Sequence, residues 1–238
     1  LDKLKERTAK SKKHILFVPD RFSLSYQKAV LEHLNIKGTF DIEVSSFPRL
    51  ADKLITDKRR VLDKQSEIML LRKVIDDNKD GLLRFGKMGK NADFVNDMYA
   101  AISQIRNSNI SVDRLRNAIE FLPKRIADKT KDIVKIYHNY VEYIQNGYSD
   151  GTSKLQALCD MIYGGALNDC EVYISDFTSF SAIEYEIIKA IMLNAVHTHI
   201  CLVDSDGENS HVFPKDVKNR LFSLADEVGI SMYISYSN

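Results

Sequence analysis

Two kinds of hydrophobic spacing follow one another along this 238-residue chain. Near both ends, short apolar runs typical of strands alternate with stretches whose apolar residues recur at the three- and four-residue spacing of an amphipathic helix. Between about residues 60 and 165 only the helical spacing occurs. Strands are predicted at 15–18, 42–45, 171–175, 199–203 and 230–235, and the helices near them at 1–7, 23–34, 181–195, 214–228 and from residue 48.

The order of these elements predicts the fold class. Strands that alternate with helices at this spacing imply one parallel sheet with right-handed connections. We therefore expect an α/β domain made of residues 1–58 and 167–238, interrupted by an all-helical insertion over residues 59–166. One helix start is also marked, because Ser181 with Glu184 three positions later has the spacing of a capping box.

Three short segments that follow predicted strands carry the candidate chemistry. Segments 19–23 (PDRFS), 45–49 (SSFPR) and 175–180 (SDFTSF) each combine an aromatic residue with polar or basic ones. Ligands of an open parallel sheet bind outside the carboxyl ends of its strands, so these segments are expected along one edge. A single-stranded nucleic acid needs ring faces for its bases and cations for its phosphates. The sequence therefore predicts a single-strand-binding edge.

The same side chains also allow a simpler interpretation. Phenylalanines at strand ends commonly pack in the core, and this alternative applies to Phe47 and Phe177. Arginine is rarely buried without a partner, so Arg21 and Arg49 are expected at the surface, where they could hold phosphate or the edge of a guanine. Ser23 could donate a hydrogen bond to the same ligand.

Composition adds limits rather than a function. The chain is 44% hydrophobic and 28% charged, as in ordinary globular proteins, and its net charge of +1 does not by itself demand a nucleic-acid partner. No apolar run approaches the roughly 20 residues that cross a bilayer, and three cysteines without CxxC spacing fit a reducing compartment. We expect a cytoplasmic protein, no membrane contact and no metal site. A chain without an initiator methionine is also expected to be part of a longer protein.

Motifs for nucleotide hydrolysis are missing from the sequence. No GxxxxGK[ST] phosphate loop occurs, and the run GKMGK at 86–90 has the wrong spacing and no preceding strand. Asp176 stands where a Mg²⁺-binding carboxylate could lie, but Phe177 occupies the place of a second acid. We expect no catalytic residue and no ATP hydrolysis by this chain alone.

The candidate segments also resemble a known family. Residues 15–23 (ILFVPDRFS) resemble the element hhhVPEQFT of the B subunit of AddAB (RexAB) helicase–nucleases, and residues 45–51 (SSFPRLA) resemble its element SFSRLA. Further similarities, in the family's order, lie at 68–73 (IMLLRK), 148–150 (YSD) and 174–181 (ISDFTSFS), with Glu184 at the family's acid. The resemblance covers the whole chain.

The resemblance implies a bacterial protein of double-strand-break repair and recombination. The family's AddB subunit has a superfamily 1 helicase-like region that has lost motor function, guides single-stranded DNA and recognises a Chi-type signal. It implies a RecA-like domain with a 1B-like helical insertion, and an AddA-type helicase–nuclease subunit as partner. ATP with Mg²⁺ and the iron–sulfur cluster would lie outside this segment or be lost, so no cofactor is expected. By motif position, DNA recognition would fall to Arg21, Ser23, Phe47, Arg49 and Phe177.

Three positions depart from the family's pattern. Arg21 stands where the family often has Gln, Asp52 where an aromatic can occur, and Asp176 where it has Gly. An acid near DNA is unfavourable, so either the recognised sequence differs or recognition is weaker.

Two other functions stay open. One is a truncated active superfamily 1 helicase, although the single acid at Asp176 argues against it. The other is a structural scaffold that docks the motor subunit.

Overall fold

The computed structural model describes most of the chain as two compact units. The described residues are 13–38, 41–56, 59–202 and 215–233. One unit comprises residues 1–56 with 154–238, and the other comprises residues 57–153. The predicted helix at 1–7 lies outside the described residues.

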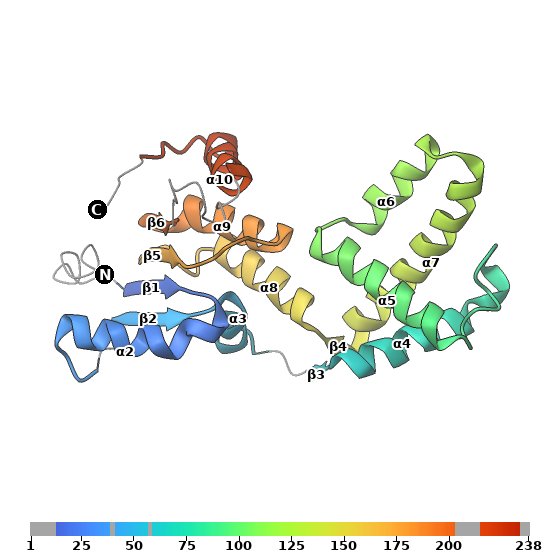
Figure 1. The fold of residues 1–238 in the computed structure, drawn as a ribbon, viewed down its shortest axis with the longest axis horizontal. Helices are drawn as coiled ribbons and strands as arrows, with labels where there is room; N and C mark the ends of the chain where they lie inside the picture. The colour runs from blue at the N-terminus through green and yellow to red at the C-terminus, as the bar shows by residue number, and fades with distance from the viewer. Residues whose placement is uncertain (1–12, 39–40, 57–58, 203–214, 234–238) are drawn as a thin grey trace, which may run out of the picture. The chain divides into compact units, whose positions relative to one another are not determined.

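The first unit is built on a four-stranded parallel sheet (Figure 1). Its order is β2-β1-β5-β6, and each neighbouring pair is parallel, which confirms the predicted α/β class with a parallel sheet. β5 is buried at five of its six positions, as expected for a strand covered on both faces. The strands are β1 (Lys13–Phe17), β2 (Ile42–Ser45), β5 (Cys170–Ser175) and β6 (His197–Cys201).

Five helices accompany this sheet in the described part of the unit. They are α2 (Ser23–Leu34), α3 (Phe47–Leu54), α8 (Gly151–Tyr163), α9 (Ala182–Asn194) and α10 (Lys215–Glu227), with a short 3-10 turn, η2, at Asp20–Phe22. The expected capping box is confirmed, since both of its hydrogen bonds between Ser181 and Glu184 are present at the start of α9. The strand expected at 230–235 is wrong as far as the structure describes it, because residues 230–233 form no strand.

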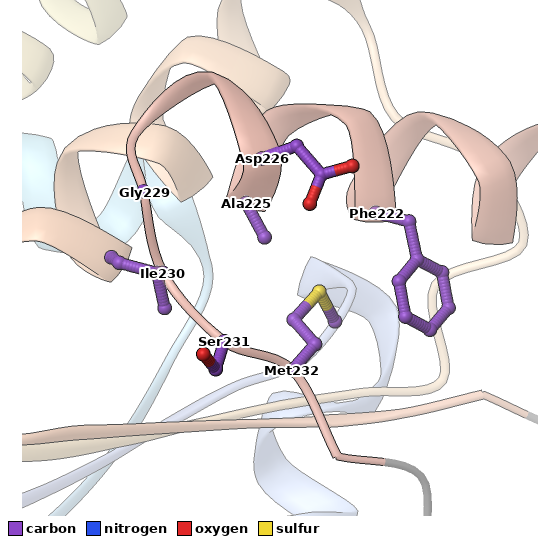
Figure 2. Close-up of a pocket in the computed structure, with 7 residues that line it drawn as sticks. All are labelled: Phe222, Ala225, Asp226, Gly229, Ile230, Ser231 and Met232. Carbon is purple, nitrogen blue, oxygen red and sulfur yellow. The ribbon is translucent and has the colours of Figure 1, made fainter.

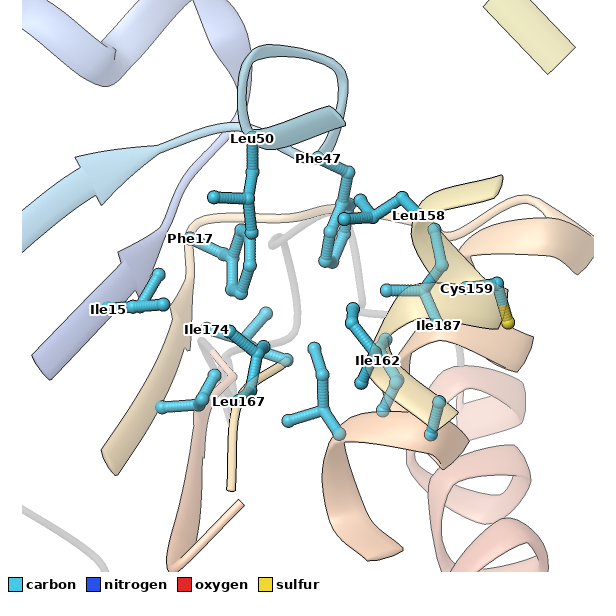
Figure 3. Packing of buried hydrophobic residues seen from close by; sticks show 14 of the residues in the cluster. Ile15, Phe17, Phe47, Leu50, Leu158, Cys159, Ile162, Leu167, Ile174 and Ile187 are labelled. Carbon is cyan, nitrogen blue, oxygen red and sulfur yellow. The ribbon is translucent and has the colours of Figure 1, made fainter. Parts of the chain in front are cut away.

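Alternating side chains of the strands face two separate cores. Leu16 and Val18 join Val30 of α2 on one face of the sheet. Ile15 and Phe17 point to the opposite face, as the two-residue period of a strand requires. Figure 3 shows part of this second and larger core. It gathers buried residues of α3, α8, α9 and α10, among them Phe47, Leu158, Ile187 and Leu221.

The second unit is mostly helical but not entirely so. Its helices are α4 (Lys64–Asp77), α5 (Ala92–Asn107), α6 (Val112–Ala118) and α7 (Lys124–Gly147), with short turns η3 (Lys79–Gly81) and η4 (Ile119–Phe121). The expectation of an all-helical segment is wrong in one respect: β3 (Arg60–Val61) and β4 (Tyr148–Ser149) pair as a parallel ladder. Two-residue strands are too short to show an alternating pattern in the sequence.

Helix α8 also groups differently from the expected domain limit at residue 166. Leu158, Cys159 and Ile162 of this helix are buried in the core beneath the sheet. The compact units accordingly divide at Ser153, before most of α8. Helical spacing in a sequence shows that a helix has a buried face, but it does not show which core covers that face.

A buried ion pair ties the end of β4 to α5. The Arg106 guanidinium donates to both carboxylate oxygens of Asp150, with Nη2 at 3.1 Å from Oδ1, and the two side chains are 11% and 2% exposed. Asp150 Oδ1 also accepts the Ser153 amide at 2.8 Å, at the start of α8. Burial acts to raise the pKa of Asp150, but the hydrogen bond and charge of Arg106 outweigh it and lower the pKa below its usual value.

Arg106→Ala should therefore destabilise the protein strongly. It leaves the Asp150 carboxylate buried without its cation, and removing one partner of a buried pair costs about 3–5 kcal/mol. The free energy of unfolding from urea titrations checks this. Arg116→Ala is the control, because its pair with Asp113 is 54% and 80% exposed and should contribute under about 1 kcal/mol. Equal losses in the two variants would contradict the prediction.

Glu67→Gln should change how stability depends on pH. Burial and the charge of Asp150 raise the pKa of Glu67 above 4.5, so the folded state loses stability as pH rises from that value through the folded pKa. Glutamine keeps an acceptor for the Tyr140 hydroxyl, which lies 3.1 Å from the carboxylate, and cannot ionise. The free energy of unfolding of the variant, relative to the parent, should increase between about pH 4 and about pH 7. A constant difference would contradict this.

Candidate nucleic-acid interface

The structure brings the three candidate segments to one edge of the sheet. Phe17, at the end of β1, is in register with Ser45 at the end of β2 and with Ile174 near the end of β5. All three strands run the same way, so the segments that follow them leave the sheet side by side. We call the residues 19–23, 45–49 and 175–180 the strand-end edge.

An acid links two of these segments. Asp20 Oδ1 accepts hydrogen bonds from Arg49 Nε at 2.6 Å and from Ser46 Oγ at 3.1 Å. Ser46 in turn caps α3 by accepting the Arg49 amide at 3.4 Å. The Arg49 and Asp20 side chains are 47% and 61% exposed, so their pair is a surface ion pair that contributes about 1 kcal/mol or less. A phosphate could therefore compete with Asp20 for Arg49 at little cost.

The other two polar residues of the edge have different environments. Arg21 is exposed, and its guanidinium lies over the Phe22 ring, 4.6 Å from the ring centre. Ser23 is fully buried, and its hydroxyl donates to the Asp20 carbonyl at 2.9 Å. Ser23 thus holds the turn that presents Arg21 and starts α2. A contact of Ser23 with DNA stays a prediction.

Three phenylalanines of the edge, Phe47, Phe177 and Phe180, pack against one another in the core. Phe47 is 0% exposed and stacks on Phe17 with the ring centres 4.6 Å apart (Figure 3). Phe177, 9% exposed, lies 5.4 Å from Phe47 and 5.0 Å from Phe180. Core packing, the simpler of the two sequence interpretations, describes both rings in this structure. Base stacking by Phe47 and Phe177 stays a prediction.

Asp176 has an unusual backbone conformation. Its φ of +62° lies in the left-handed region, which glycine adopts freely and aspartate tolerates better than most residues. This explains why a position that can be glycine accepts aspartate. The carboxylate accepts the Ser175 hydroxyl at 2.8 Å and the Tyr26 hydroxyl. Burial and then this hydrogen bond raise the pKa of Tyr26, so the phenol stays protonated and donates.

Two further observations bear on charge at this edge. The Asp52 carboxylate forms an ion pair with Lys154 of α8. The positive charge of Lys154 compensates the negative charge of Asp52, which the sequence alone indicated to be unfavourable near DNA. Sequence reasoning missed this partner because it lies about a hundred positions away.

Among the described residues, no group of three or more His, Cys, Asp or Glu side chains could hold a metal ion.

Two surface hollows lie apart from the strand-end segments. The larger, about 370 Å³, opens between α10 and residues 229–232, where Figure 2 shows the side chains of Asp226, Ser231 and Met232 around it. Its one charged lining residue is the acid Asp226, and its lining includes no Lys or Arg that could hold a phosphate beside the ring of Phe222. The smaller, about 280 Å³, lies in the mostly helical unit between α6 and α7. Its lining is basic, with Arg116 of α6 and Lys131, Lys135 and His138 of α7, and helical spacing could have indicated the three residues of α7.

The fold and this edge define a class: an α/β protein with a parallel sheet, whose chain also forms a second, mostly helical unit between β2 and β5. The family described as ADDB, N-terminal, matches residues 1–236, and the chain belongs to that family. This confirms the resemblance found in the sequence. Within the described residues, no helix is long and apolar enough to span a membrane.

Three curated relatives are all named as the B subunit of an ATP-dependent helicase/deoxyribonuclease. The protein of Lachnoclostridium phytofermentans is 28% identical across 91% of this chain. Those of Clostridium kluyveri and Listeria innocua are both 29% identical, across 82% and 81% of it. The chain spans only about a fifth of the length of these relatives, 19%, 18% and 17% respectively.

Phe47→Ala should act on stability before it acts on any ligand. The substitution empties space in a core that is closed around the ring, which costs about 3–5 kcal/mol for phenylalanine. Phe47→Leu keeps most of the volume and should cost less. Leu24→Ala, at a position that is 71% exposed, is the control and should change the free energy of unfolding by about 0.5 kcal/mol or less. Urea unfolding of the three variants measures this, and a loss below about 1 kcal/mol for Phe47→Ala would argue against a core role.

Proposed function

We propose that this chain is the N-terminal, helicase-like part of a B subunit of a bacterial helicase–nuclease that acts in DNA double-strand-break repair. In this proposal the parallel sheet belongs to a RecA-like domain, and the mostly helical unit is its 1B-like insertion. The partner is an AddA-type subunit that supplies the motor, and the site of action is the cytoplasm. Family membership and the names of the relatives support the B-subunit assignment.

We propose further that the strand-end edge binds single-stranded DNA without catalysis, and that this contact serves Chi-type sequence recognition. The observation that carries the proposal is the placement of two exposed arginines, Arg21 and Arg49, at adjacent strand ends of one sheet. Their guanidinium groups can hold phosphates or fork onto a guanine. No step requires ATP, in keeping with the missing phosphate loop and with the engagement of Asp176 by two hydroxyl donors.

The buried residues of the edge have a positioning role in this proposal. Phe47 and Phe177 pack beneath the segments and fix the backbone from which Arg49 projects. Ser23 closes the turn that carries Arg21. A base could stack on these rings only after the segments moved outward, so the arginines are expected to dominate the affinity.

The double variant Arg21→Ala with Arg49→Ala should bind single-stranded DNA less tightly. Its affinity should also depend less steeply on salt concentration. Each lost phosphate contact lowers the slope of log affinity against log salt by about 0.7 for a single strand, so the pair should lower it by about 1.4. Fluorescence anisotropy of labelled oligodeoxythymidine, titrated with the chain at several salt concentrations, measures both quantities.

Lys28→Ala with Lys53→Ala is the matched control. It removes two exposed cations from α2 and α3, which are paired with Glu32 and Glu43, outside the strand-end edge. The control should leave the slope within about 0.5 of the parent. Equal reductions in both double variants would show a general charge effect and would contradict a specific role for the edge.

One observation favours a second candidate function, the docking of a partner subunit. Leu24, the second residue of α2, follows the edge residue Ser23 and is 71% exposed, so an apolar side chain is open to a partner next to the edge. A Leu24→Asp variant that keeps its DNA affinity but loses assembly with an AddA-type subunit, measured by size-exclusion chromatography, would favour docking over DNA binding.

A further inference from the structure

The connection between α6 and α7 exposes apolar side chains among cations. Phe121, the last residue of η4, is 86% exposed, and Ile126 in the first turns of α7 is 51% exposed. Lys124 and Arg125, between them in the sequence, are exposed as well. A phenylalanine that is almost fully in water contributes nothing to the core of its unit, and here it lies close in sequence to a second exposed apolar residue and two exposed cations.

A row of basic side chains continues from this connection along α7. Lys124, Lys131, Lys135 and His138 follow one another at intervals of seven, four and three residues, which places them on one face of the helix. At about 1.5 Å per residue the row is about 21 Å long. It ends at the exposed Glu142, one turn after His138.

The hollow of about 280 Å³ lies along this row. It is lined by Lys131, Lys135 and His138 of α7 and by Arg116 of α6, together with two apolar residues, Ile119 and Val134, which we call its floor. Within the described part of the chain, neither Lys131 nor His138 forms an ion pair. The other two basic residues of the hollow, Arg116 and Lys135, have weak partners that a ligand could displace.

Those partners are few and exposed. Arg116 pairs with the exposed Asp113 at 2.6 Å, and Lys135 donates to the Gly81 carbonyl at 3.2 Å. Asp128, the nearest acid on the same face of α7, is engaged by Arg84 at 3.2 Å. The hollow therefore keeps an excess of positive charge over an apolar floor.

We propose that the α6–α7 hairpin, residues 112–138, is a second binding surface for single-stranded DNA. Arg116, Lys131, Lys135 and His138 hold phosphates along the hollow. The exposed ring of Phe121, two residues after the lining residue Ile119, stacks on a base. An exposed aromatic beside a line of cations is the arrangement that binds single strands with little sequence preference. The inference rests on the proposed function only for the choice of DNA as the ligand, since none of these residues belongs to the strand-end edge.

The sequence offers a direct probe of stacking at this surface. The chain contains no tryptophan, so Phe121→Trp introduces a single indole at an exposed position. Titration with oligodeoxythymidine should quench its fluorescence, with an affinity equal to that measured by anisotropy. Phe121→Ala should weaken binding about five- to one-hundred-fold without changing the salt slope, because the ring carries no charge.

A charge variant tests the hollow itself. Lys131→Ala with Lys135→Ala should reduce the salt slope by about 1.4 and weaken binding at low salt at least about ten-fold. Lys87→Ala with Lys90→Ala removes the same charge from exposed positions of the same unit and should leave both quantities nearly unchanged. All these positions are exposed, so circular dichroism should show the parent's fold in every variant.

These experiments test the proposals for the two DNA-binding surfaces independently, so that either one can be rejected without the other. Quenching of Phe121→Trp fluorescence that persists when Arg21→Ala and Arg49→Ala are added supports the hairpin and leaves the strand-end edge to its own salt test. Absence of quenching at saturating DNA, or equal losses in the Lys131/Lys135 and Lys87/Lys90 variants, overturns the proposal. So does quenching by poly-glutamate with no response to DNA, which would identify the hairpin as a surface for an acidic protein.

Discussion

The packed rings of Phe17, Phe47 and Phe177 are the contact on which the strand-end edge depends. They come from β1, from the first residue of α3 and from the segment after β5, and their centres lie 4.6 and 5.4 Å apart. Aromatic rings at these distances contribute about 0.5–1.5 kcal/mol per pair beyond the area they bury. Because each ring lies in or next to a different strand-to-helix connection, their packing holds the three connections together from beneath.

This packing separates the residues that hold the edge from the residues that can meet a ligand. Ser23 and Phe47 are fully buried, whereas Arg21 and Arg49 remain at the surface, where Arg49 pairs with the exposed Asp20. The α6–α7 hairpin has the opposite arrangement, with its aromatic ring in water and its cations over an apolar floor. One surface thus offers cations supported by buried rings, and the other offers an open ring together with cations.

The mostly helical unit depends on a different kind of interaction. Its core contains aliphatic and aromatic side chains, but the Arg106–Asp150 pair and the Glu67–Tyr140 hydrogen bond lie among them. Buried polar groups that are fully paired favour one arrangement over others, because any shift leaves a charge or a donor unsatisfied. This accounts for the specific joining of β4 to α5, which the hydrophobic pattern alone did not require.

Local patterns in the chain were enough to define the parallel α/β class, the meeting of three strand ends and the family, because apolar periodicity and short ordered motifs are properties of neighbouring residues. The packed fold was needed to establish which aromatic residues are buried: Phe47 and Phe121 cannot be told apart by type, yet they are 0% and 86% exposed. It was also needed to establish the partners of Asp52 and Asp150, which lie about a hundred and 44 positions away in the chain. Burial and long-range ion pairing arise only when distant segments pack, so no local pattern could reveal them.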